Sequence, residues 1–273
     1  MNTKQLFVGK THSKWQKRFF IGVSINFLYF ATIKTKRMKK ILIAAFAISA
    51  LLACDKKEND KNLHITGKVE GLKQGKLYIQ HIVDSSLVTM DSIIIKGNSN
   101  FESDLQLTEP EMLYLSLNRG VSKSPDNILP FFAESGNMTI ETTLKEFYAK
   151  AKITGSKNND LYHDFKKIKE RYSDEQNKTL SMSLLAKKMN NTKELDSLNQ
   201  RIDKLTLRSY LDIINFTVNN GKHEVAPYIA LTEIYDTNIK YLDTIQKSMS
   251  PEVAKSKYGK QLTEFIAKRK ASE

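Results

Sequence analysis

The spacing of apolar residues changes from two to about 3.6 near residue 156, and this change limits the possible folds more than any other feature. Before it, Leu63, Ile65 and Val69 alternate with polar neighbours, the pattern of a half-buried strand. Residues 134–137 are typical of a hairpin turn. The full set of predicted strands covers residues 63–69, 77–82, 87–95, 101–105, 112–117, 128–133 and 138–142.

After residue 158, apolar residues recur at helical spacing, in stripes at 161–172, 195–205 and 207–218. Ser173 and Asn191 are each followed three residues later by Gln or Glu, which predicts a helix start at both. Further helix signals are a stop at residues 219–221, a helix at 228–235 and a start at Ser250-Pro251. Residues 259–270 are polar and charged, so we expect them to fray or to form a tail.

Together these patterns predict an α+β protein in which an antiparallel β-sandwich or small barrel is followed by a helical region. The helical stripes either pack on each other and on the sheet or form a coiled coil with a partner. Only two heptads keep one register, which favours internal packing.

A second feature is an apolar run that ends at the only cysteine of the chain. Met38, Lys39 and Lys40 form a short basic segment, ten apolar or small residues follow, and the run closes with Leu51, Leu52, Ala53 and Cys54. This stretch resembles a bacterial lipoprotein signal peptide at residues 38–53, with residues 51–54 as the lipobox. The resemblance implies that Cys54 is the lipid attachment site and that cleavage occurs before it. As a membrane-spanning helix, residues 41–53 would be too short.

The residues on either side of this signal are interpreted from it. Residues 54–62 are charged and are expected to be a solvated tether. Residues 1–37 are too long for a signal's basic segment, and we expect them to be a start-site overrun, with translation beginning at Met38. The alternative is an additional anchor at residues 19–33, a run that is short for a membrane span.

The net charge of +13 does not indicate a nucleic-acid partner once it is located along the chain. Residues 1–53 hold ten of the 43 basic residues and none of the 30 acidic ones, so the remainder carries only +3. No basic surface with interleaved aromatic residues is expected on such a body. Two or three acyl chains on Cys54 would hold the protein on a membrane without basic help, since each buried CH₂ contributes about 0.8 kcal/mol.

The search for catalytic and metal-binding patterns gives no candidate. A single cysteine excludes an intramolecular disulfide and a Cys-x-x-Cys redox pair. His64, His81, His163 and His223 lack the spacing of paired metal ligands and are expected to be structural or surface residues. Tyr114, Phe131 and Phe132 line either a groove or, as we expect, the core. We therefore predict no catalytic residues, no metal site, no cofactor and no enzymatic activity.

Three segments of the first half resemble the DUF4369 domain: residues 65–69, 75–79 and 91–101. The resemblance covers about residues 63–155, and the helical region at 156–273 is similar to the linker of the same proteins. In that family the domain commonly precedes a thioredoxin-like disulfide-reductase domain, and residues 256–259 look like the last element before it. Thiol–disulfide exchange needs two thiols, however, and the single cysteine here is assigned to lipid, so the redox activity is not transferred.

These observations predict a protein tethered to a membrane of the cell envelope by its N-terminal lipid, with a non-catalytic binding or interaction module of unknown ligand. Asp55 favours the inner membrane, whereas residues 57–60 loosely resemble a surface-export signal, and both destinations stay open. Two alternatives remain. One is an accessory subunit that acts with a separate thioredoxin-like envelope protein. The other is a hydrolase assembled from scattered polar residues.

Overall fold

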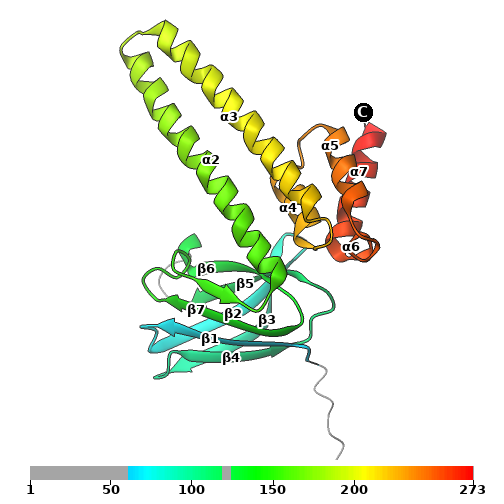
Figure 1. The fold of residues 1–273 in the computed structure, drawn as a ribbon. Coiled ribbons are helices and arrows are strands. Elements are labelled where there is room, and N and C mark those ends of the chain that lie inside the picture. The colour runs from blue at the N-terminus through cyan, green and yellow to red at the C-terminus, as the bar shows by residue number, and fades with distance from the viewer. Residues whose placement is uncertain (1–60, 119–123, 273) are drawn as a thin grey trace, which may run out of the picture. The chain divides into compact units, whose positions relative to one another are not determined.

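The computed structural model of the chain describes residues 61–118 and 124–272. Two mostly antiparallel four-stranded sheets come first and helices follow, which confirms the α+β prediction (Figure 1). The strands are β1 (Leu63–Glu70), β2 (Gln74–Val83), β3 (Ser86–Lys96), β4 (Asn100–Leu105), β5 (Glu111–Asn118), β6 (Ile128–Ala133), β7 (Gly136–Thr143) and β8 (Lys152–Thr154). The helices are α2 (Lys157–Lys188), α3 (Thr192–Asn219), α4 (Val225–Glu233), α5 (Ile239–Ser248), α6 (Pro251–Lys255) and α7 (Lys257–Ser272), with a short 3-10 turn at Pro125–Asn127.

The strands are arranged as a sandwich with the orders β4-β1-β7-β8 and β3-β2-β5-β6. β1 and β7 run parallel, while the other paired strands are antiparallel. The predicted hairpin at residues 134–137 is wrong, because β6 and β7 belong to different sheets and this turn carries the chain from one to the other. A turn signal between two apolar runs does not specify whether the runs pair.

The sandwich core is formed by side chains from both sheets, including Leu63, Ile65, Leu77, Leu115 and Phe131. A second apolar core lies between the other face of the β5–β6 end of one sheet and the helices. Phe132 and Met112 contribute to it from the strands, and Ile229 and Leu262 from the helices. The adjacent residues Phe131 and Phe132 are both fully buried, so the expectation of core packing for them is confirmed. Since neighbouring strand residues face opposite ways, one ring lies in each core.

Two helix predictions are wrong. Ser173 does not start a helix, because α2 continues through it from Lys157 to Lys188. Residues 259–270 belong to α7 and do not fray. Tyr258, Leu262 and Ile266 recur at intervals of four and are buried, although lysines between them make the segment polar on average. The helical spacing of the apolar residues therefore indicates the structure of this segment better than its mean polarity does.

Other helix ends are confirmed. The Asn191 side chain accepts a hydrogen bond from the Glu194 amide at the start of α3, and α3 ends at Asn219. Ser250 caps α6 with Pro251 in the first turn. α2 and α3 pack along each other as a helical hairpin (Figure 1). Among the helices of the described residues, none combines the length and apolar composition that a membrane span requires.

Replacing Phe132 with alanine should lower the free energy of unfolding by about 3–5 kcal/mol, because the ring fills the second core and a cavity would remain. Ile94→Ala is the matched control, since Ile94 is 58 % exposed, and it should change stability by less than about 0.5 kcal/mol. Urea unfolding followed by circular dichroism measures both. Equal effects of the two substitutions would contradict the two-core description.

Candidate functional site

A pair of buried asparagines at the start of α2 joins strand β6 to the helices. Asn159 accepts a hydrogen bond from the Phe132 amide (3.0 Å). This bond gives a partner to a backbone N–H group of β6, which is an edge strand. Asn158 accepts from the Val225 amide (2.9 Å) and donates to Glu134 and Glu224 (2.8 and 2.9 Å). Buried polar groups are costly unless they are paired, so these contacts fix α2 and α4 against the sheet.

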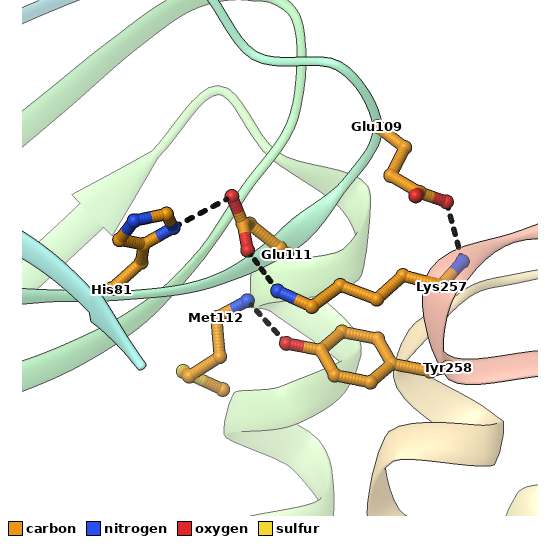
Figure 2. A network of polar contacts seen from close by, with 6 residues as sticks. All are labelled: His81, Glu109, Glu111, Met112, Lys257 and Tyr258. Carbon is orange, nitrogen blue, oxygen red and sulfur yellow. Dashed lines mark hydrogen bonds and ion pairs between the residues drawn. The ribbon is translucent and has the colours of Figure 1, made fainter. Parts of the chain in front are cut away.

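A second polar network attaches the start of α7 to strand β5 (Figure 2). The Lys257 ammonium pairs with Glu111, and the Lys257 amide donates to Glu109. The Tyr258 hydroxyl accepts a hydrogen bond from the Met112 amide (3.0 Å). We call these three interactions the β5–α7 contact.

Residues 256–259, which the sequence resemblance singled out, supply the helix side of this contact through Lys257 and Tyr258. Ser256 donates to the Val253 carbonyl and accepts from the Gly259 amide. A side chain at Gly259 would place its Cβ atom 1.9 Å from the Val253 oxygen, so only glycine fits. The segment therefore has a structural role, in holding the last helix on the sheet.

The four histidines of the described residues lie apart from one another. His81 Nδ1 is 3.5 Å from Glu111 Oε1, beside the β5–α7 contact, and His64 pairs with Asp104 on an exposed surface. His163 is exposed on α2, and His223 lies in the turn that precedes α4. Within residues 61–118 and 124–272, no cluster of three or more His, Cys, Asp or Glu side chains has the arrangement of a metal site.

A chain of aromatic rings runs from the β5–α7 contact toward the start of α2. The Tyr258 and Tyr228 centroids are 5.0 Å apart, and Tyr228 lies 6.1 Å from Tyr162 in an edge-to-face arrangement. Phe132 contacts both Tyr228 and Tyr258. Burial raises the pKa of the Tyr162, Tyr228 and Tyr258 hydroxyls well above the ordinary value. These hydroxyls therefore stay protonated at pH values at which an exposed tyrosine ionises.

A groove of about 550 Å³ lies at the far end of this aromatic chain, between α2 and the segment that leads into β8. We call it the β8–α2 groove. Leu129, Ala151 and Ile153 supply apolar surface, and Thr154, Asn159 and His163 add polar groups. β8 is an edge strand, so this side of the sheet is not covered by another strand. The volume is within the range of small-molecule sites.

The most unusual group in the groove is the ammonium of Lys166. It lies 5.5 Å from the centroid of the Tyr148 ring and 5.3 Å from that of Tyr162. Among the described residues it forms no hydrogen bond or ion pair, and burial lowers the pKa of this lysine while Glu170 opposes the shift. A half-buried cation that lies against two ring faces and forms no hydrogen bond would gain from an anion that entered the groove.

The groove also limits which anions fit. Asp160 and Glu170 line it together with Lys152 and Lys166, so carboxylates and ammonium groups balance. A ligand with several negative charges would be repelled. A ligand with a single anionic group and an apolar or aromatic body matches the lining better.

Sequence reasoning missed this groove. Tyr162 and Lys166 share one face of α2, but Tyr148 and Ile153 come from the strand region, and their meeting depends on how the helix docks. The residues predicted for lipid attachment, Leu51, Leu52, Ala53 and Cys54, lie outside the described residues.

Comparison with known protein families supports the predicted DUF4369 domain. The family model described as "Domain of unknown function (DUF4369)" matches residues 63–162. The chain therefore carries a DUF4369 domain. The match contains both sheets and the first turns of α2, with Tyr162 at its end, so the β8–α2 groove lies where the DUF4369 match ends. Searches of curated proteins and of solved structures gave no significant match.

The buried tyrosines should make stability fall above pH 10. In the unfolded chain their hydroxyls ionise near pH 10, whereas in the folded chain they stay protonated, so the unfolded state binds fewer protons there and is favoured as pH rises. Each protonated tyrosine should contribute about 1.4 kcal/mol of lost stability per pH unit. Urea unfolding at several alkaline pH values measures the slope.

Tyr258→Phe should reduce this slope by one tyrosine's share, and it should also cost about 1–3 kcal/mol at neutral pH because the Met112 amide loses its acceptor. Tyr235→Phe, at a 52 % exposed position, is the control and should change neither quantity. A slope that is the same in wild type and Tyr258→Phe would show that this hydroxyl ionises in the folded protein.

Proposed function

We propose that this protein is lipid-anchored in the bacterial cell envelope through Cys54 and that its body binds a ligand without catalysing a reaction. The lipobox at residues 51–54, the basic residues before the apolar run and the charged tether after it support the anchor. The membrane and the face on which the body lies are left open by this proposal.

The observation that carries the binding role is the unpaired Lys166 ammonium in the β8–α2 groove. The ligand class it favours is a small organic molecule with one carboxylate or similar anionic group and an apolar or aromatic body. The anionic group would lie at Lys166, while the body would rest against Leu129 and Ile153. Nothing in this set combines a nucleophile with a base that would activate it, so binding is favoured over hydrolysis.

The second candidate is an accessory role beside a separate thioredoxin-like reductase. It is supported by the DUF4369 match and by the resemblance of residues 256–259 to the element that precedes such a domain. Purifying the protein from its native envelope and identifying bound proteins separates the two: a thioredoxin-like partner favours this role, and its absence favours the ligand-binding role.

Cys54→Ala should abolish labelling with radioactive palmitate and release the body from the membrane fraction. The reason is that two or three acyl chains, each contributing about 0.8 kcal/mol per CH₂, provide the anchoring in this proposal. Labelling of cells that express wild type or variant, followed by fractionation, measures both effects. Unchanged labelling would refute the anchor.

Lys166→Met should abolish carboxylate binding in the groove. In a nuclear magnetic resonance screen of matched aromatic acids and their amides, the acids should perturb signals of Tyr148 and Tyr162 in wild type and the amides should not. Lys178→Met, at an exposed lysine farther along the same helix, should retain the response. Equal responses to acids and amides, or an unchanged response in Lys166→Met, would contradict the assignment.

A further inference from the structure

The end of the α2–α3 hairpin exposes large apolar side chains. Leu184 is 60 % exposed, Leu185 61 % and Met189 78 %, and Leu180 and Met182 are also exposed. Four of them lie in the last three turns of α2, and Met189 is the residue that follows the end of this helix. Single exposed apolar residues are ordinary, but a group of this size on one short segment marks an interaction surface.

These side chains are not needed for the hairpin itself. The buried residues of this part of α2 are small, namely Thr179, Ser183 and Ala186, and they recur on one helix face at intervals of four and three. Leu180 and Met182 lie on the flanks of that face, and Leu184 and Leu185 lie on the opposite side of the helix. α2 and α3 can therefore pack together while the large apolar groups remain available.

The same segment is basic. Residues 176–193 contain Lys178, Lys187, Lys188 and Lys193 and no acidic residue. Among the described residues, none of these lysines forms an ion pair. Acidic residues begin again at Glu194 and Asp196 on α3. Positive charge is thus concentrated on the α2 side of the tip, next to the exposed apolar groups.

The tip is also preformed. Asn190 has a positive φ of 52°, the Asn191 amide donates to the Ala186 carbonyl and the Asn190 amide donates to that of Lys187. These two hydrogen bonds end α2 in a Schellman motif, and the side chain of Asn191 also caps the start of α3. Binding at the tip would therefore require little ordering of the chain. In Figure 1 the tip lies at the end of the hairpin remote from both sheets.

We propose that this tip, residues 178–193, inserts into the surface of an anionic lipid bilayer. Leu184, Leu185 and Met189 would enter the boundary between headgroups and acyl chains, as apolar faces of interfacial helices do. The lysines would stay at the level of the lipid phosphates, which their long side chains allow. Charge complementarity selects anionic lipid over an uncharged surface. The inference is independent of the anchor at Cys54.

A reporter at the tip tests this inference. In the full chain with Cys54→Ser, Met189→Cys is labelled with an environment-sensitive dye, and Lys260→Cys, on exposed α7 surface, carries the same dye as a control. Phosphatidylcholine vesicles with phosphatidylglycerol should shift the emission of the residue-189 dye to the blue, and quenchers placed in the lipid should reach it. Vesicles without phosphatidylglycerol, and the dye at residue 260, should give no response.

Two sets of substitutions extend the test without disturbing the fold, because all the changed side chains are exposed. Leu184→Gln with Leu185→Gln should weaken vesicle affinity at least about tenfold, and Lys187→Gln or Lys188→Gln about fivefold each. Circular dichroism verifies that the variants are folded.

Other outcomes would overturn the inference. No shift of the residue-189 dye on anionic vesicles would do so, as would equal responses at residues 189 and 260. A shift that grows with protein concentration in the absence of vesicles would assign the tip to a second copy of the chain instead.

Discussion

The consecutive phenylalanines of β6 link the two halves of this molecule. Because successive strand residues face opposite sides, Phe131 contributes to the sandwich core and Phe132 to the core shared with the helices. The sheet that contains β6 is thus covered on both faces at this end. The Asn159 side chain accepts a hydrogen bond from the Phe132 amide. Asn159 therefore also holds the start of α2 against β6. Loss of this arrangement would separate the helices from the strands.

The β8–α2 groove follows from this docking. α2 leaves the sheet beside the edge strand β8, and Tyr162 and Lys166 on its first turns face the segment that carries Tyr148. Tyr162 is also part of the aromatic chain that leads to Tyr258, so the groove wall is supported by the core. The groove, the proposed membrane tip and the predicted anchor lie in different parts of the chain, and each is tested separately.

The sequence predicted seven of the eight described strands, several helix ends and the DUF4369 domain, because these depend on local spacing and on capping residues such as Asn191; it missed the three-residue strand β8. It did not predict that β6 and β7 belong to different sheets, since strand pairing is a long-range property. The buried stripe of α7 at Tyr258, Leu262 and Ile266 was hidden by interspersed lysines. The groove was beyond reach for the same reason as the strand pairing: its residues meet only after the helix docks.

Amide hydrogen exchange at Met112 and Phe132 tests most directly whether strands and helices form one cooperative unit. The Met112 amide donates to Tyr258 and the Phe132 amide to Asn159, so both bonds cross from strand to helix. If the account is correct, both amides exchange only through global unfolding and show the same protection as the Leu115 amide in the middle of β5. Faster exchange at Met112 and Phe132, with Leu115 still protected, would show that the helices detach from the sheet and would contradict it.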